Sequence, residues 1–447
     1  MLAAIAAVIA AAGCASVPIA SGSSVAGGAL NAQADRLVLV TIANPGGPMR
    51  SQVGSTPHGY ERVGAYSEGD QAHATAAALA RAYDLKEVRE WPIAALRVQC
   101  LVFALPPQAD RDAVLRQLAL DQRVRLAQSM QVFGSLGLQT AALDAKAAPS
   151  PQQLATVSYN DPYFELQSGF AAIEAGAAQQ WSRGEGVDVA IIDTGVDIRH
   201  PDLAGRIGTT RNFIDDDQKS FEIDRHGTEV AGIIAAVANN GLGIVGVAPA
   251  ARLQIYKACQ PQQPLRLEAW CNSFTLALAL SAAIESHAQI VNLSLGGPAD
   301  PLLTQLVSHG QRLGMIFVGA VPADGRLDGF PLNIAGVIAA QQSDRPDPDA
   351  GVLHAPGRQI LSLTPGGHYD FATGSSFAAA HVTGAIALLR SRLPGLDAAA
   401  MLALLGRTTS RDAEGQTIDV CAALAAMLAR VDCAHQETAV ATATDPP

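Results

Sequence analysis

Two successive patterns of hydrophobic positions divide the chain. From residue 36 to residue 136, short strand-like apolar runs and helix-like spacings follow one another in the order strand, helix, two strands, helix, strand. The predicted elements are Leu37–Ile42, Ala72–Leu85, Trp91–Ala94 leading into Leu96–Leu105, Asp110–Leu120 and Val124–Phe133. This order is the split βαβ arrangement of ferredoxin-like domains. We therefore expect an α+β domain over residues 35–137.

A longer pattern fills residues 159–434. Residues 187–192 are apolar apart from Asp188, as in a strand that is buried on both faces. Val230, Ile233 and Ile234 recur instead at helical spacing. Buried strands that alternate with amphipathic helices predict an α/β domain with a mainly parallel sheet and helices on both faces.

Composition and charge limit the possible partners. The 447 residues are too many for one average domain, and 49% hydrophobic with 16% charged residues is typical of a well-buried α/β core. The formal net charge is −11, and the chain has no run of Lys or Arg that would bind phosphate. We therefore expect no nucleic-acid partner.

Three polar residues stand in glycine-flanked settings. Asp193 ends the buried strand before Gly195, His226 begins a helix in His-Gly-Thr, and Ser376 begins another helix after Gly-Ser. Each has common structural roles when taken alone. Together they favour a nucleophilic Ser376, with His226 as the base and Asp193 orienting the imidazole, because a hydroxyl attacks only when an imidazole takes its proton.

The three motifs and four flanking phrases resemble the subtilisin-like serine peptidases over about residues 157–432. The phrases are His200–Leu203, Gly246–Pro249, Asn292–Gly297 and Val337–Ala339. The resemblance implies a subtilisin-like fold and a serine endopeptidase that cleaves polypeptides through an acyl-enzyme on Ser376.

Substrate binding is also implied by the resemblance. Ser294, Leu295 and Gly296 correspond to the edge strand that pairs with the backbone of an extended substrate. The other interpretation of these three residues is an ordinary sheet strand.

One departure from the family concerns the oxyanion hole. Ala323 stands where the family has an asparagine whose side chain helps to hold the oxyanion. Losing that donor costs about 2.7–4 kcal/mol of transition-state stabilisation, a magnitude measured in this same family. The Ser376 backbone N–H remains, and Ser375 offers a hydroxyl. Ala323 thus favours one alternative, a catalytically weak peptide-binding or chaperone-like protein.

The first residues resemble a bacterial lipoprotein signal. Residues 2–12 are apolar, too few to span a bilayer, and lead into Gly13 and Cys14. We expect a signal over residues 1–14, lipidation of Cys14 and a flexible tether over residues 15–34. Ordinary signal cleavage after residue 34 is the rival interpretation. The protein is then lipid-anchored at the bacterial cell envelope, with the membrane as a partner, or secreted.

The resemblance assigns residues 35–137 as a propeptide that assists folding and blocks the site until it is cut. An unrelated accessory domain is the alternative. The linker over residues 138–158, rich in Ala, Gln and Pro, is the expected processing region. Residues 435–447 are polar and expected to be disordered, and we expect a monomer.

Six cysteines agree with export. Cys259 and Cys271 are twelve residues apart, as are Cys421 and Cys433, so local pairing is our hypothesis among the three ways in which four cysteines can pair. Cys100, in an apolar strand, is expected to be a buried thiol.

Calcium is the one candidate cofactor. Asp202 and Asn240 resemble parts of a family calcium site, whose ligands are hard oxygens. A tight turn built from Asn and Gly is the favoured alternative, so we expect no required cofactor.

Overall fold

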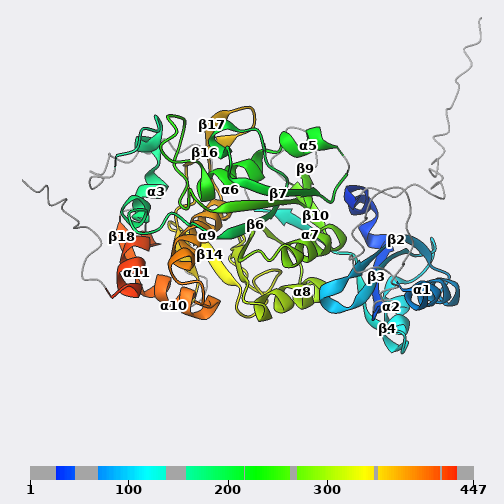
Figure 1. Cartoon of the computed structure of the whole chain (residues 1–447). Coiled ribbons are helices and arrows are strands. Elements are labelled where there is room, and N and C mark those ends of the chain that lie inside the picture. Colours follow the sequence, from blue (N-terminus) through cyan, green and yellow to red (C-terminus); the bar gives the residue numbers. More distant parts are fainter. Residues whose placement is uncertain are drawn as a thin grey trace, which may run out of the picture.

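The computed structural model describes residues 27–45, 69–136, 158–215, 217–261, 269–346, 351–412 and 415–429 (Figure 1). Cys14 and its signal, residues 15–26 of the tether, residues 138–157 of the linker, Cys433 and the tail over residues 435–447 lie outside the described residues. No helix in the described part of the chain is both long and apolar enough to cross a membrane.

The N-terminal domain has the predicted order of elements. They are β1 (Leu37–Ala43), α1 (Asp70–Ala82), β2 (Lys86–Ile93), η2 (Ala94–Leu96), β3 (Val98–Ala104), α2 (Arg111–Leu120) and β4 (Val124–Ser129). The sheet order is β2-β3-β1-β4. Strand alternation gives the sheet two apolar faces: Val38 and Val40 pack in the cluster beneath α1 and α2, whereas Leu37 and Leu39 pack toward the larger domain.

Two predictions at the ends of this domain are wrong. The strand expected over Val124–Phe133 breaks near Met130, and β5 (Val132–Ser135) leaves the sheet to join the larger domain. The end of the tether is folded: η1 (Gly27–Arg36) is a 3-10 helix, and its Leu30 and Ala34 are buried in the cluster shared with the larger domain.

The larger domain is built on a seven-stranded sheet of order β15-β14-β13-β11-β6-β8-β7. Its strands are β6 (Asp188–Asp193), β7 (Ile207–Asn212), β8 (Arg252–Lys257), β11 (Ile290–Leu293), β13 (Ile316–Ala320), β14 (Ile338–Gln342) and β15 (Leu353–Ala355). All six neighbouring pairs are parallel, which confirms the predicted fold class.

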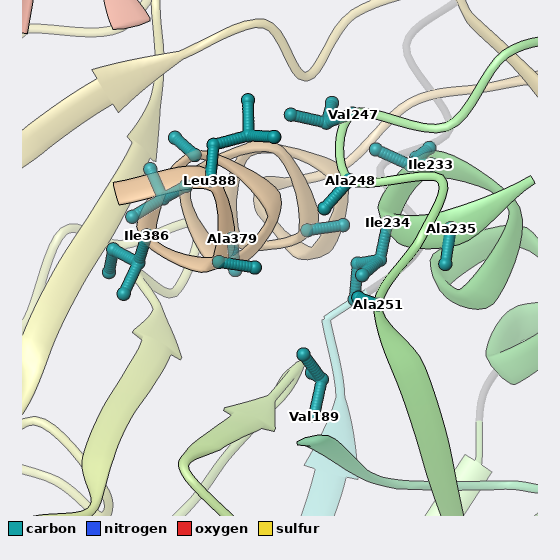
Figure 2. Close-up of a cluster of buried hydrophobic side chains, with 14 of the residues drawn as sticks. Val189, Ile233, Ile234, Ala235, Val247, Ala248, Ala251, Ala379, Ile386 and Leu388 are labelled. Carbon is teal, nitrogen blue, oxygen red and sulfur yellow. The ribbon is translucent and has the colours of Figure 1, made fainter. Parts of the chain in front are cut away.

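Helices cover both faces of this sheet (Figure 1). Val189 and Ile191 of β6 pack with α6 (Arg225–Ala235) and α9 (Ser375–Arg392). Ala190 and Ile192 pack on the opposite face with α7 (Ser273–Glu285) and α8 (Pro301–Arg312). Figure 2 shows residues of α6 and α9 meeting in one cluster with Val189. This packing fixes the starts of α6 and α9, where two of the predicted site residues lie.

The remaining elements lie around this core. They are η3 (Phe164–Leu166), α3 (Ser168–Ala172), α4 (Ala175–Ala178), η4 (Pro201–Leu203), α5 (Gln218–Glu222), β9 (Cys259–Pro261), β10 (Ala269–Asn272), β12 (Leu295–Gly296), β16 (Ile360–Thr364), β17 (His368–Ala372), α10 (Ala398–Arg407), β18 (Thr409–Asp412), β19 (Gly415–Ile418) and α11 (Val420–Met427).

The N-terminal domain packs against the starts of α7 and α8. Trp91 meets Phe274 edge to face, with ring centroids 4.7 Å apart. Asp300 caps α8, and the buried amide of Gln128 donates to its carboxylate at 2.8 Å while accepting the Leu302 N–H at 3.0 Å. Gln128 therefore supplies part of the cap of a helix in the other domain.

Replacing Gln128 tests this interface. Gln128→Ala leaves a buried N–H and a buried carboxylate oxygen short of a partner, which costs about 1–3 kcal/mol. We expect a lower denaturant midpoint for the N-terminal domain of the full chain, measured in a Ser376→Ala background. Gln108→Ala, at an exposed glutamine of the same domain, is the matched control. Equal midpoints for the two variants would contradict the assignment.

Candidate active site

Asp193 and His226 meet at the carboxyl end of the sheet. Asp193 is the last residue of β6, and His226 is the second residue of α6. A 2.7 Å hydrogen bond joins His226 Nδ1 to Asp193 Oδ1, and the Thr194 N–H donates to the same oxygen at 2.7 Å. Both side chains are at most 3% exposed. The carboxylate therefore fixes the ring through Nδ1, and Nε2 has no partner in the described part of the chain.

The glycines of the two motifs allow this approach. A Cβ on Gly227 would lie 2.0 Å from the Gly195 carbonyl oxygen, and Gly195 itself has φ of +137°. The Gly227 N–H also donates to Thr194 Oγ1 at 3.2 Å. The start of α6 thus lies directly against the turn after β6, which brings the imidazole to the carboxylate.

Burial and charge act in opposite directions on His226. Burial alone lowers the pKa of the imidazole, but the Asp193 carboxylate favours the charged form, and the net result is a raised pKa.

A buried ion pair that sequence reasoning missed lies beside this pair. Lys257 ends β8 opposite Asp193, and its ammonium binds the carboxylate of Asp224, the residue before α6. Lys257 Nζ also donates to the Ser220 carbonyl at 3.1 Å. Burial raises the pKa of Asp224 to about 7, against the opposing effect of Lys257. In the sequence, a lysine at the end of an apolar strand could have indicated a buried partner of opposite charge. The pair connects β8 to the start of α6 and so helps to position His226.

Ser376 lies at the start of α9, but its hydroxyl is not bonded to His226. Ser376 is the second residue of the helix and is fully buried. Its Oγ donates to the Ser294 carbonyl oxygen at 3.3 Å. His226 Nε2 has no hydrogen-bond partner among the described residues. The structure thus joins two of the three predicted catalytic side chains and leaves the third bonded to the backbone beside β12.

A polar network beneath Ser376 was also missed. Asn292, a polar residue in the buried β11, donates to Ser294 Oγ at 2.8 Å and accepts from Thr383 Oγ1 at 2.9 Å. Ser294 Oγ donates to the Ser376 carbonyl at 3.3 Å. This network connects the end of β11 to α9, and the polar Asn292 within an apolar run was its sequence signal.

Two backbone N–H groups that could hold an oxyanion lie at the start of α9. Ser375 and Ser376 are the first two residues of α9, so their backbone N–H groups have no acceptor within the helix and lie at its positive end. Ser375 is buried, whereas Ala323 lies exposed in the turn after β13 and its methyl group donates nothing.

Ser294, Leu295 and Gly296 border a strand from the N-terminal domain. β5 pairs antiparallel with β12, with Ser135 opposite Leu295 and Gly134 opposite Gly296. On its other side β5 pairs antiparallel with β10. The next residue, Leu136, donates its N–H to the Ser294 carbonyl at 3.1 Å. Residues 132–136 thus occupy the edge of β12 at which the resemblance implies substrate binding, here called the cleft. Leu136 and the Ser376 hydroxyl share one acceptor.

Phe133 is the deepest side chain of this inserted strand. It is 1% exposed and meets Phe330 edge to face at a centroid distance of 5.5 Å. A Cβ on Gly297 would lie 2.5 Å from the Phe133 ring. The glycine therefore leaves the space in which the aromatic ring is buried.

The candidate calcium residues are bonded to each other. Asn240 Nδ2 donates to Asp202 Oδ1 at 2.8 Å, and the Ile244 N–H donates to Asp202 Oδ2 at 3.0 Å. The amide thus presents its nitrogen to Asp202, which does not suit a shared cation. Within the described ranges no three His, Cys, Asp or Glu side chains are grouped to hold a metal. Calcium binding by Asp202 and Asn240 stays a hypothesis, with the tight turn as the favoured alternative.

Four of the cysteines lie in the described part of the chain. A disulfide joins Cys259 of β9 to Cys271 of β10. Cys421 is buried at the start of α11. Cys100 is a buried free thiol in β3, and burial raises its pKa well above the ordinary value. The disulfide closes the hairpin whose second strand borders the cleft.

Comparison with known proteins places this site in a family. A model of the Subtilase family matches residues 184–423, just over half of the chain. An intracellular serine protease of Paenibacillus polymyxa is 38% identical over 245 residues, which cover 51% of this chain and 73% of that protein. Thermitase of Thermoactinomyces vulgaris is 34% identical, over 52% of this chain and 85% of its own.

Solved structures agree in fold. Fervidolysin from Fervidobacterium pennivorans, a keratinolytic enzyme related to subtilisin, matches with a TM-score of 0.65 at 22% identity, over 91% of this chain and 62% of its own. With the family match and the relatives above, the chain belongs to the subtilase family, the subtilisin-like serine peptidases.

Proposed function

We propose that this chain is the precursor of a serine endopeptidase that hydrolyses peptide bonds through an acyl-enzyme on Ser376. One observation carries the proposal: the Leu136 N–H and the Ser376 hydroxyl bind the same carbonyl oxygen, that of Ser294, so a peptide backbone lies beside the nucleophile. The buried Asp193–His226 pair supplies the base.

The chemistry needs one rotation. Ser376 must turn about its Cα–Cβ bond so that Oγ leaves the Ser294 carbonyl and bonds to His226 Nε2, which has no other partner in the described part of the chain. Oγ then attacks the scissile carbonyl while its proton passes to Nε2. The imidazolium, stabilised by Asp193, returns that proton to the leaving amine. A water molecule repeats the sequence and releases the acid.

The inserted strand supports a particular first substrate. Strand addition places Gly134 opposite Gly296 and leaves Leu136 beside Ser376, so the Leu136 carbonyl is the group that Ser376 attacks. We therefore propose that residues 35–136 are a propeptide and that processing cuts the bond between Leu136 and Gly137. This bond lies just before the linker over residues 138–158 in which the sequence predicted processing.

Export is part of the proposal. The disulfide between Cys259 and Cys271 favours an oxidising compartment, in contrast to relatives whose names call them intracellular. The sequence before Cys14 favours lipidation at the envelope.

A catalytically weak peptide-binding protein is the second candidate. Ala323 donates no hydrogen bond to an oxyanion, and the Ser376 hydroxyl is bonded away from His226. These two observations favour tight binding of an extended peptide with slow turnover.

Labelling of Ser376 separates the two candidates. A fluorophosphonate probe should label the processed wild-type protein, and Ser376→Ala should abolish both labelling and processing because it removes the nucleophile. N-terminal sequencing of the mature chain should begin at Gly137. Ser391→Ala, near the other end of α9, is the matched control. An unlabelled wild type favours the binding protein, and processing retained in Ser376→Ala assigns the cut to another protease.

The pH dependence tests His226 as the base. Only the neutral imidazole accepts the Ser376 proton, so kcat/KM should fall as pH decreases through the His226 pKa. Because Asp193 raises that pKa, the midpoint of the acid limb should lie above the ordinary value of 6.5. Asp193→Asn should lower kcat about 10⁴-fold through the wrong tautomer. A midpoint below 6.5 in the wild type would contradict this account.

Restoring the missing amide tests the oxyanion hole. Ala323→Asn should raise kcat, by up to about 10²–10³-fold if the side chain donates to the oxyanion. Ala323→Asp is the isosteric control, because a carboxylate accepts hydrogen bonds and repels developing negative charge. If Asn and Asp change the rate equally, the loop does not border the oxyanion.

A further inference from the structure

The N-terminal segment η1 binds the peptidase domain outside the cleft. Asn272, fully buried at the end of β10, donates to the Gly27 carbonyl at 3.0 Å and to Asn31 Oδ1 at 2.7 Å. Gln260 of β9 donates to the Gly28 carbonyl at 3.1 Å, and the Gly28 N–H donates to the Ile214 carbonyl at 3.2 Å. The Asn31 amide also donates to the Trp270 carbonyl at 3.5 Å, so five hydrogen bonds join Gly27–Asn31 to this face.

The fit of this segment is close. A Cβ on Gly27 would lie 2.2 Å from the Phe213 carbonyl oxygen, and a Cβ on Gly28 would lie 2.3 Å from Gln260 Oε1. Leu30 is 2% exposed and packs in the apolar cluster with Phe274 of α7. The face therefore accepts only a segment with two glycines, because a side chain at either position would clash, followed by an apolar residue in the place of Leu30.

The same hairpin contacts both ends of the N-terminal domain. Cys271 of β10 pairs with Phe133 in the cleft, and Cys271 is joined by the disulfide to Cys259 of β9. The next residue, Asn272, binds η1. The hairpin therefore connects a contact inside the cleft with a contact outside it.

We propose that the face formed by Gln260, Asn272 and the Ile214 carbonyl, here called the hairpin face, is a second binding site, besides the cleft, for the N-terminal fragment that the cut releases. This fragment carries η1 together with the proposed propeptide, which also contacts α7 and α8. The occupant of the hairpin face is the segment Gly27–Asn31 of the same chain. The proposal rests on the proposed processing between Leu136 and Gly137. Hydrolysis of that bond adds one water and leaves two polypeptides, and only non-covalent contacts then hold the propeptide.

After the cut, the η1 contact and the strand in the cleft belong to the same fragment, so each favours rebinding of the other. When the new carboxyl end at Leu136 leaves the cleft, η1 keeps the propeptide on the hairpin face at a high effective concentration, so the strand rebinds. The peptidase then stays inhibited until the strand in the cleft, the η1 contact and the interface of Trp91 and Gln128 with α7 and α8 have all opened. Weakening η1 should speed release without changing the cut itself.

The full-length chain, left to process itself, provides the test. The dissociation rate of the cut propeptide is read from the onset of fluorophosphonate labelling and from the propeptide that remains bound on gel filtration. Asn31→Ala should speed release about three- to tenfold, since it removes hydrogen bonds at a buried site. Gly27→Ala should act at least as strongly, because its methyl group meets backbone. Gln33→Ala, exposed in the same segment, is the matched control.

A change on the opposite partner keeps the test independent of propeptide folding. Gln260→Ala leaves the propeptide sequence intact and should speed release to a similar extent. Release at the wild-type rate in Asn31→Ala, Gly27→Ala and Gln260→Ala would overturn the second site. A wild type that never cuts itself would instead overturn the proposed function, so the two failures are distinct.

Discussion

The carbonyl oxygen of Ser294 lies where three parts of the chain meet. It accepts the Leu136 N–H from the inserted strand and the Ser376 hydroxyl from α9, and it belongs to the residue between β11 and β12. Asn292 donates a buried hydrogen bond to the Ser294 side chain and accepts one from Thr383, and these bonds fix the position of Ser294. The position of the inserted peptide backbone relative to the Ser376 hydroxyl therefore depends on one acceptor.

Parallel strands explain why distant residues gather there. β6 and β11 are neighbours in the sheet, so Asp193 and Ser294 emerge at the same edge. The helices that begin at this edge bring His226 and Ser376 by their first turns, where free backbone N–H groups and the positive helix end also lie. The fold thus sets both the positions of these side chains and the positive potential around them. Gly195 and Gly227 allow the close approach that joins Asp193 to His226.

The sequence predicted what depends on local pattern. Asp193 at a strand end and His226 and Ser376 at helix starts follow from apolar spacing and glycine settings, and the structure places them so. Contacts between distant segments had no such signature. Neither the departure of β5 from its sheet nor the anchoring of η1 on Asn272 is encoded in periodicity, because each depends on a surface of the other domain. The rotamer of Ser376 likewise depends on a backbone carbonyl from another strand.

The place of Leu136 beside Ser376 bears on where the mature enzyme works. Cys14 precedes Leu136 in the chain, so under the proposed lipidation and cut a lipid on Cys14 would stay on the N-terminal fragment and not on the peptidase domain. The membrane would then retain the spent inhibitor, while the peptidase diffuses away. Anchoring would limit where activation occurs rather than where proteolysis takes place.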